Sequence, residues 1–343
     1  MCIDGLKIMN RQIIITGGLG YIGSHTIVEL KDYFDEFIVI DDLSNSNLSV
    51  IYQLEKLTGK KIVHFSSTVT DDKKLRNIFA EYNPTNVIHF AGLKSVHESE
   101  KYPEKYFFTN VTGTETLLNV IKEFDCENFI FSSSATVYGD PEYLPYDENH
   151  PTKPINNYGR SKLIAEQLIH QWSIEHEISS ISLRYFNPVG AHHSGLIGEK
   201  PQGVPNNLMP YILEVISGNI EELNIYGDDY DTKDGTGERD YIHVVDLAKA
   251  HVAALNYSSS KYVNDFINIG TGSSISVLDI INIFESKLQT KIKYKITDRR
   301  AGDLPQYYAK TKKAKDLLKW ESDKDLFDMC ADSLRWQQNY IKV

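Results

Sequence analysis

The feature that most constrains the fold is a cluster of glycines directly after the first strongly apolar run of the chain. The run covers Gln12–Thr16, and Gly-Gly-Leu-Gly-Tyr-Ile-Gly follows it from Gly17 to Gly23. Gly17 can turn the chain sharply at positive φ, Gly20 lets the backbone approach a pyrophosphate, and Gly23 lets a helix pack closely on the strand. The N–H groups and positive dipole end of that helix would face the phosphates. The pattern therefore predicts a strand–turn–helix unit that binds a dinucleotide.

An acidic pair stands at the end of the next apolar run. Asp41 lies 18 residues after Gly23, and Asp42 follows it. A carboxylate at this spacing can accept hydrogen bonds from both ribose hydroxyls and would repel a 2′-phosphate. Asp41 could also be only a turn residue at the end of a strand, but its spacing favours the cofactor role, and therefore NAD over NADP.

Short apolar runs and amphipathic stretches alternate over the first 190 residues. Strands are predicted at Gln12–Thr16, Phe37–Asp41, Asn86–Ala91, Asn128–Ser132 and Ser180–Tyr185. Helices are predicted at Tyr21–Asp35, Asp72–Tyr82, Asn110–Phe124 and Tyr158–Glu175. The alternation predicts an α/β fold of the Rossmann type, a doubly wound parallel sheet with helices on both faces.

The alternation breaks down after Asn187, where residues 188–240 are rich in Gly, Pro, Asn and Asp. Further helices are predicted at Leu208–Ser217, His243–Leu255 and Val277–Gln289, with a short strand at Phe266–Ile269. We therefore expect an N-terminal extension at residues 1–10, a dinucleotide-binding domain at 11–187 and a smaller, mainly substrate-binding C-terminal domain at 188–343. The sequence does not define the boundary near residue 188 sharply, and the chain can cross back to the first domain.

A tyrosine and a lysine stand four residues apart in the helix predicted at Tyr158–Glu175. Tyr158 and Lys162 would share one helix face, with Cβ atoms roughly 5–6 Å apart. A neighbouring ammonium lowers the pKa of a phenol, so Tyr158 could take a proton from a sugar hydroxyl while a hydride leaves the same carbon. Most such pairs are only surface neighbours. Here they follow a serine cluster at the C-terminal end of a strand, where open α/β sheets bind ligands, and Ser134 could bridge the hydroxyl and Tyr158.

Composition excludes several classes of protein. The 36 basic and 47 acidic residues give a net charge of −11, which argues against non-specific binding to nucleic acid or to anionic membrane. Cys2, Cys126 and Cys330 form neither a disulfide framework nor a metal pattern, so we expect a reducing, cytoplasmic location. We expect no signal peptide in the first residues, and no stretch approaches the roughly 20 apolar residues of a membrane span.

Two patterns could suggest a metal. His192 and His193 are adjacent, but neighbouring histidines seldom chelate one ion, and no Asp, Glu or Cys stands at ligand spacing. The acidic run Gly227–Asp234 lacks the spacing and the final Glu of an EF-hand. We predict loop roles for both segments and no metal site.

The motifs together resemble the extended short-chain dehydrogenase/reductase superfamily, and within it the enzymes that epimerise UDP-hexoses at C4. The resemblance runs from about Gln12 to the C-terminus. It is most specific in the runs Pro-Gln-Gly-Val-Pro-Asn-Asn-Leu-Met-Pro from residue 201 and Asp-Gly-Thr-Gly-Glu-Arg-Asp-Tyr-Ile-His-Val from residue 234. The other matching segments are Thr16–His25, Asp41–Ser46, His89–Val96, Phe131–Gly139, Tyr158–Lys162, Arg184–Ala191 and Arg299–Tyr307.

The resemblance implies a reversible, redox-neutral epimerisation of UDP-galactose and UDP-glucose through a 4-keto intermediate, with tightly bound NAD as transient hydride acceptor. Tyr158 would remove the proton from the 4-hydroxyl, Ser134 would hold the 4-oxygen, and Lys162 would bind the nicotinamide ribose and tune Tyr158. It also implies a homodimer, in which helices Asn110–Phe124 and Tyr158–Glu175 of two chains form a bundle. No nucleic-acid or membrane partner is implied.

The resemblance extends to the residues that would bind the two ligands. For the cofactor it implies Gly17, Gly20, Tyr21, Ile22, Gly23, Asp41, Asp42, Asn45, Ser46, Thr68, Val69, Phe90, Ala91, Gly92, Lys94, Asn110, Ser132, Tyr158, Lys162 and Tyr185. For the UDP-sugar it implies Lys94, Ser134, Tyr158, Phe186, Asn187, Asn207, Leu208, Asn224, Ile225, Tyr226, Arg239, Arg300, Asp303 and Tyr307. The arginines could meet phosphate oxygens, Asp303 ribose hydroxyls, and Tyr226 the uracil ring.

Two positions bear on how closely the chain follows the family. Thr68 stands where the family often has an Asp near the adenine amino group, and a hydroxyl is the weaker acceptor. Tyr307 resembles the bulky residue that some members place beside the sugar. It should crowd a 2-N-acetyl group, so we expect a preference for UDP-glucose and UDP-galactose over their N-acetyl forms.

Two other functions compete on the same fold. A nucleotide-sugar 4,6-dehydratase needs an acid and a base for water loss, which related enzymes supply as Asp-Glu after the Ser or Thr at the strand end. This chain has Ala135 and Thr136 there. A non-catalytic, nucleotide-sensing protein would have no need of Tyr158 and Lys162, and the chain has both.

Overall fold

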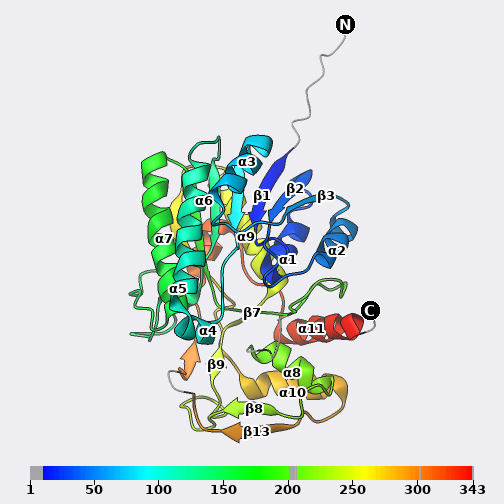
Figure 1. Ribbon diagram of the computed structural model, residues 1–343. Helices are drawn as coiled ribbons and strands as arrows, with labels where there is room; N and C mark the ends of the chain where they lie inside the picture. Colours follow the sequence, from blue (N-terminus) through cyan, green and yellow to red (C-terminus); the bar gives the residue numbers. More distant parts are fainter. Residues whose placement is uncertain (1–10, 201–204, 206, 301–302, 342–343) are drawn as a thin grey trace.

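The computed structural model describes residues 11–200, 205, 207–300 and 303–341. Its centre is a seven-stranded parallel sheet in the order β11-β6-β5-β4-β1-β2-β3 (Figure 1). The order reverses between β1 and β4, which is the switch point where doubly wound sheets bind ligands. The strands are β1 (Gln12–Thr16), β2 (Glu36–Ile40), β3 (Lys61–Phe65), β4 (Asn86–His89), β5 (Asn128–Ser132), β6 (Ser179–Tyr185) and β11 (Asn264–Ile269). The predicted fold class is confirmed.

Helices cover both faces of this sheet (Figure 1). One face carries η1 (Phe107–Thr112), α3 (Asp72–Tyr82), α6 (Gly113–Ile121) and α7 (Asn157–His176), and the other carries α1 (Tyr21–Glu29), α2 (Ser49–Thr58) and α9 (Val244–Ser258). Side chains alternate between the faces along a strand. In β1, Ile13 and Ile15 therefore join one buried cluster, whereas Ile14 joins the other. Two covered faces explain why the strands are continuous apolar runs.

The chain returns to the sheet after residue 188. Strand β10 (Tyr241–His243) pairs in parallel with β7 (Asn187–Val189), and α9 and β11 then complete the sheet and one of its helical layers. The C-terminal half of the chain therefore contributes both to the part built on the seven-stranded sheet and to a smaller part, which holds three small sheets and the helices α8 (Leu208–Ile216), α10 (Val277–Leu288) and α11 (Leu326–Ile341). The division at residue 188 stays a prediction.

The smaller part has its own core below the sheet (Figure 1). Helices α8, α10 and α11 enclose a cluster that includes Ile212, Phe284 and Met329. Three small sheets border it. They are formed by β7 with β10, by β8 (Leu223–Tyr226) with β13 (Tyr294–Thr297), and by β12 (Ile275–Ser276), β9 (Glu238–Arg239) and β14 (Gln306–Tyr307).

Several elements differ from the sequence-based expectation. Strand β3 and helix α2 were not predicted, because β3 is an edge strand carrying Lys61 and His64, and α2 buries only Leu54 fully. Helix α1 ends at Glu29, six residues before its predicted end. The helix expected from Asn110 begins instead as the π-helical turn η1, after two short helices, α4 (Val96–Lys101) and α5 (Pro103–Tyr106).

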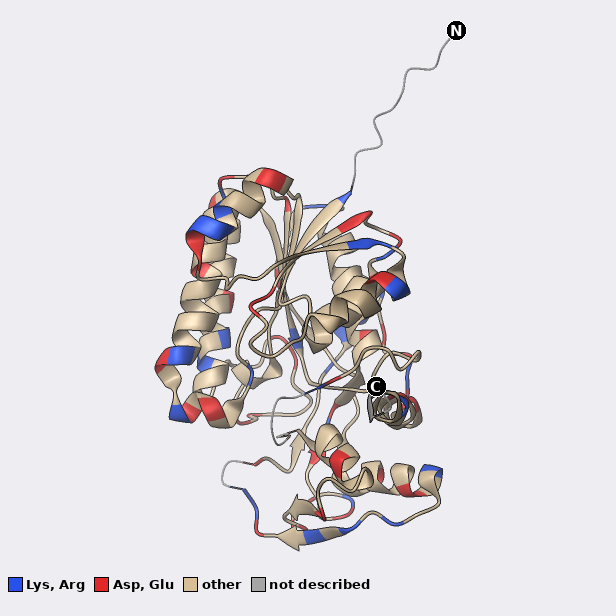
Figure 2. Cartoon of the chain, turned by 45° about the vertical axis from the view of Figure 1, so that its right-hand side comes forward, with Lys and Arg blue, Asp and Glu red and all other residues tan. Residues whose placement is uncertain are grey.

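Charged residues lie mainly on the outer helices and loops, and most of the sheet carries none (Figure 2). Both signs are interspersed on those helices. Among the described residues, no helix combines the length and the apolar character needed to cross a membrane.

Candidate active site

The glycine turn lies between β1 and α1, at the switch point of the sheet. Gly17 has φ +68°, and a Cβ atom on it would come within 2.7 Å of the backbone nitrogen of Ala91. A Cβ atom on Gly23 would come within 2.5 Å of the Gly17 carbonyl oxygen, so helix and turn are in direct backbone contact. Gly20 caps α1 and has no side chain to cover the N–H groups that begin with Tyr21 and Ile22. This cradle fits a pyrophosphate.

Asp41 follows β2 and organises the same turn. Its Oδ2 accepts from the backbone N of Leu19 at 3.0 Å, and its Oδ1 accepts from the N of Leu43 at 3.0 Å and from Ser46 Oγ at 2.7 Å. Asp41 is buried, whereas Asp42 and Asn45 beside it are exposed. The carboxylate therefore fastens the glycine turn to the loop that would border the ribose.

The loops after β3 and β4 line the next part of this edge. Thr68 Oγ1 accepts from the N of Thr70 at 3.3 Å, and the side chain of Val69 packs where a Cβ atom on Gly113 would fall. Phe90 and Ala91 both donate their backbone N–H to the Thr16 carbonyl, at 2.9 and 3.1 Å. Thr68 and Val69, predicted near the adenine, thus follow β3, whereas Phe90 and Ala91, predicted along the cofactor, follow β4.

Asn110 holds the loop after β4 against α7. Its side-chain oxygen accepts from the N of Leu93 at 2.8 Å, and its amide donates to the Leu93 carbonyl and to Ser161 Oγ, both at 3.0 Å. A Cβ atom on Gly92 would lie 3.1 Å from Asn110 Oδ1 and 3.6 Å from Lys162 Nζ. The π-helical turn η1 aims the Asn110 side chain into this place, so Asn110 supports the site from behind.

Tyr158, Lys162 and Ser134 meet where β5 and α7 come together. Lys162 Nζ donates to the Ser132 carbonyl at 2.9 Å, and the Ser132 hydroxyl lies 2.9 Å from the Tyr185 hydroxyl. Ser134 caps the short 3₁₀ turn η2 (Ala135–Val137) and its hydroxyl is hydrogen-bonded to that of Tyr158. The structure brings the three predicted catalytic side chains and both flanking hydroxyls together.

The electrostatics of Tyr158 differ from the expectation. Burial raises the pKa of Tyr158 well above its ordinary value, the nearby Tyr185 raises it further, and the bond with Ser134 opposes the shift. Burial also lowers the pKa of Lys162 to about 8, against the attraction of Glu166. The prediction of a lowered Tyr158 pKa is therefore wrong for the protein alone, because burial disfavours the phenolate more strongly than the bond with Ser134 favours it.

Several predicted UDP-sugar residues are paired with one another. Arg239 Nη2 donates to Asp303 at 3.3 Å, and its Nη1 donates to the carbonyls of Glu238 and Leu304, both at 2.8 Å. The guanidinium of Arg300 lies 3.7 Å above the centre of the Tyr226 ring. The charged groups expected at a diphosphate and a ribose thus share one region of the smaller part.

Two other predicted residues have buried polar atoms without a hydrogen-bond partner among the described residues. These are the Asn224 side-chain oxygen and the Tyr307 hydroxyl. The Tyr307 ring packs against Phe186 and Tyr146, with centres 5.0 and 4.9 Å away. A buried polar atom without a partner calls for a ligand or water. In contrast, Ile225 is part of the apolar core, so only its backbone can reach a ligand.

Glu199 is a residue that the sequence did not single out. Its carboxylate accepts from Lys94 Nζ at 2.9 Å and from the Asn207 amide at 3.3 Å, and so joins two predicted ligand-binding residues. The hydroxyl of Tyr21 nearby donates to the Gly190 carbonyl at 2.7 Å. Glu199 belongs to no sequence motif with a defined spacing, so its contacts with ligand-binding residues are recognised only in the tertiary structure.

Asp240 is a second residue that the sequence did not single out, and it holds the predicted UDP-sugar residue Asn187. Its carboxylate is fully buried and accepts from the backbone N of Thr271, Gly272 and Ala309 at 2.8–3.1 Å. Its carbonyl accepts from the N of Asn187 at 2.9 Å. Asp240 therefore ties the predicted residue Asn187 to the loop after β11. Leu208, at the start of α8, packs against the core of the smaller part.

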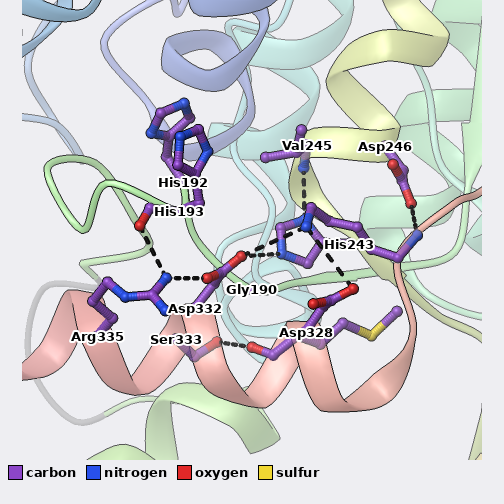
Figure 3. Close-up of polar contacts among 12 residues, drawn as sticks. Gly190, His192, His193, His243, Val245, Asp246, Asp328, Asp332, Ser333 and Arg335 are labelled. Carbon is purple, nitrogen blue, oxygen red and sulfur yellow. Dashed lines mark hydrogen bonds and ion pairs between the residues drawn. The ribbon is translucent and has the colours of Figure 1, made fainter.

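The paired histidines lie where β7, β10 and α11 meet (Figure 3). His192 Nδ1 is hydrogen-bonded to Ser194 Oγ at 2.7 Å, and the His193 carbonyl accepts from Arg335 at 2.9 Å. His243 lies beside Gly190, with Nε2 3.4 Å from a carboxylate oxygen of Asp332 (Figure 3). Within the described ranges, no group of three or more His, Cys, Asp or Glu side chains is arranged to hold a metal ion.

A doubly wound sheet with a glycine turn, a strand-end serine and a buried Tyr–Lys pair defines the class of extended short-chain dehydrogenases/reductases. A family model described as GDP-mannose 4,6 dehydratase matches residues 14–333. The chain is 46% identical to the UDP-glucose 4-epimerase of Bacillus subtilis, over 96% of this chain and 97% of that one. The chain belongs to the UDP-glucose 4-epimerases of the NAD-dependent epimerase/dehydratase family.

Solved structures agree with this assignment. The UDP-glucose 4-epimerase of Stenotrophomonas maltophila, with bound NAD and formylated UDP-arabinopyranose, superposes with a TM-score of 0.94 at 41% identity, covering 97% of this chain and 99% of that one. The enzyme of Bifidobacterium longum, in complex with NAD⁺ and UDP, superposes with a TM-score of 0.91 at 44% identity, covering 96% and 98%.

Proposed function

We propose that this chain catalyses the reversible epimerisation of UDP-galactose and UDP-glucose at C4, with NAD bound tightly throughout. The observation that carries the proposal is the convergence of Ser134, Tyr158 and Lys162 at one strand end. The family membership supports it, since relatives named for this activity match 96% of the chain.

The residues around the switch point fit the cofactor. The turn from Gly17 to Gly23 and the start of α1 would hold the pyrophosphate, and Asp41 would face the adenosine ribose. Lys162 and Tyr185 stand near the serine end of β5, where the nicotinamide ribose would lie. NAD, when bound, supplies a site that accepts a hydride from C4 and returns it.

The protein itself handles the proton. Ser134 holds the 4-oxygen, and Tyr158 takes the hydroxyl proton and later gives it back. Because burial disfavours the phenolate, Tyr158 needs positive charge nearby. We infer that the Lys162 ammonium, one helical turn further along α7, supplies it. The buried position of both side chains also keeps water away from the keto sugar.

We propose that the smaller part binds the UDP portion. Arg239 would exchange its bond with Asp303 for a phosphate oxygen, and Asp303 would then accept from a ribose hydroxyl. The unpaired atoms of Asn224 and Tyr307 would gain partners from the substrate.

The proposal is tested by conversion of UDP-galactose to UDP-glucose without added NAD. We expect turnover by the wild type, its loss in Tyr158→Phe, and full activity in Tyr52→Phe, an exposed tyrosine of α2. Denaturing the purified protein should release NAD in amounts close to one per chain. A wild-type protein that carries NAD and shows no turnover would contradict the proposal and favour a regulatory role.

Water elimination is less well supported than epimerisation, although the matching family model is named after a dehydratase. Ala135 is buried, and the Thr136 hydroxyl donates to Ser134 Oγ at 2.9 Å. Neither side chain can act as an acid or a base at neutral pH. We therefore expect no 4-keto-6-deoxy sugar among the products.

We propose a homodimer built on η1, α6 and α7. Large apolar side chains are exposed on this side of the sheet, including Phe108 on η1 and Ile164 and Ile174 on α7. Pairing these helices with those of a second chain would bury them. A sedimentation mass of one chain at micromolar concentration would refute the dimer, and Phe108→Glu should weaken it.

We also propose a cytoplasmic location. Cys126 and Cys330 are both buried free thiols, which a reducing compartment preserves. Fractionation of the source cells would test the location, with activity expected in the cytosolic fraction.

A further inference from the structure

One buried ion pair lies behind the reacting groups and joins α7 to β6. Glu166 is completely buried, and only 5% of the Arg184 side chain is exposed. Arg184 Nε and Nη2 donate to the two carboxylate oxygens at 3.0 and 2.7 Å. The desolvation of two charges offsets much of their attraction, so such a pair is a weak source of stability. Its contacts point to a role in placing other residues.

Glu166 holds the beginning of the segment that carries Ser134. Tyr158, Lys162 and Glu166 follow one another at four-residue intervals, so they share one face of α7. Ser133 Oγ donates to Glu166 Oε1 at 2.5 Å. The residue before Ser134 is therefore tied directly to the helix face that carries Tyr158 and Lys162.

Arg184 holds the end of the same segment. Its Nη1 donates to the Tyr138 hydroxyl at 3.2 Å, and the Tyr138 hydroxyl donates to Asn268 Oδ1 at 2.6 Å. The guanidinium also lies over the rings of Tyr138 and Phe266, 5.0 and 4.6 Å from their centres. Residues 133–138, which include Ser134 and η2, are thus fastened at both ends to one ion pair.

We propose that Glu166 and Arg184 are positioning residues that set the place of the Ser134 hydroxyl relative to Tyr158 and Lys162. Neither residue contacts the reacting atoms, and the inference rests on the proposed epimerase activity. Glu166 has a second effect, because its negative charge favours the charged form of Lys162 against burial. His89 on β4 also interacts electrostatically with Lys162, and Tyr158 precedes it by one helical turn on α7. From β6, Tyr185 contacts the Ser132 hydroxyl next to the carbonyl that Lys162 binds, and Arg184 pairs with Glu166.

Ser133→Ala tests the positioning without disturbing the ion pair. We expect kcat to fall about 10- to 100-fold while KM stays nearly constant, because a small misplacement of a reacting group carries a penalty of this size. The alkaline limb of the kcat–pH profile should not move, since both charges remain. Ser173→Ala is the matched control, because Ser173 of α7 is also a buried serine and donates to the Ile178 carbonyl at 2.6 Å. Its kcat should equal that of the wild type.

Glu166→Gln tests the charge. The amide keeps the size of the side chain, so kcat should fall and the alkaline limb should move to lower pH, because Lys162 loses its ammonium proton more easily. Glu166→Asp keeps the charge and should restore the position of the limb.

The outcomes separate the two proposals. Inactive wild-type protein would refute the epimerase function, whereas active wild type with normal kcat in Ser133→Ala would overturn the positioning role. An unmoved alkaline limb in a folded Glu166→Gln would overturn the charge effect. Should Glu166→Gln not fold, the kcat of Ser133→Ala compared with that of Ser173→Ala still tests the positioning role.

Discussion

The glycine turn allows a sharp test, because the chain contains a matched pair of glycines. Gly17 and Gly59 have nearly the same positive φ angle, +68° and +66°. A Cβ atom on Gly59 would meet nothing within 4 Å, whereas one on Gly17 would lie 2.7 Å from the Ala91 nitrogen and 2.9 Å from the Ala91 Cα. Replacing each by alanine therefore separates the cost of the backbone conformation from the cost of the clash.

The expected free energies of unfolding follow from these distances. Gly59→Ala should lose about 1 kcal/mol, the cost of a left-handed conformation in a residue with a Cβ atom. Gly17→Ala carries the same cost plus about 1–3 kcal/mol of overpacking, because both neighbouring atoms belong to the backbone of the β4 loop. The total for Gly17→Ala is about 2–4 kcal/mol, and the displaced turn should also lose its NAD.

Urea denaturation of both variants, with the NAD content measured beforehand, checks the reasoning. We expect Gly59→Ala to retain wild-type NAD and Gly17→Ala to retain little. Since bound NAD itself stabilises the folded state, the denaturation midpoints should be compared after NAD has been removed. Equal losses in the two variants would refute the argument that the close approach of strands β1 and β4 requires a glycine at residue 17.

Three further predictions concern titration and specificity. Burial lowers the pKa of His251 to about 4. The stability that neutral His251 contributes is therefore complete above the unfolded pKa of about 6.5 and is lost as pH falls toward 4. His251→Leu should flatten the fall in denaturation midpoint between about pH 6.5 and pH 4. Burial raises the pKa of Cys126 and of Cys330 to about 12; in a Cys2→Ser background the folded protein should therefore resist iodoacetamide at pH 8, and rapid labelling would contradict their burial. Tyr307→Ser should raise kcat/KM for UDP-N-acetylgalactosamine relative to UDP-galactose, and a wild type that already turns over the N-acetyl sugar faster would refute the crowding argument.

Local sequence patterns predicted several strands and helices correctly. The bounds of β1 and β5 and those of α3 agree with the sequence-based prediction, because an uninterrupted apolar run or an acidic cap marks each of them. Edge strand β3 escaped prediction because Lys61 and His64 interrupt its apolar run. Helix α2 also escaped prediction, although Val50, Ile51, Leu54 and Leu57 pack against the core at helical spacing. The helix predicted from Asn110 begins within the π-helical turn η1, whose i→i+5 hydrogen bonds the α-helical apolar period did not predict.

The glycine turn shows what the sequence by itself determined. Its glycines, the acidic strand end at Asp41 and the spacing of Tyr158 and Lys162 are local patterns, and each predicts chemistry because the required geometry spans only one turn or one strand end. Family resemblance added the reaction and the substrate.

Only the tertiary structure decided the environment of those groups. Burial depends on segments far apart in the chain, so it reversed the expected direction of the Tyr158 pKa. Glu199, Asp240 and the Glu166–Arg184 pair gain their contacts from residues up to 105 positions away, and no local spacing records such contacts. The sequence therefore identified the reacting side chains, whereas the fold determined how they are charged and what holds them in place.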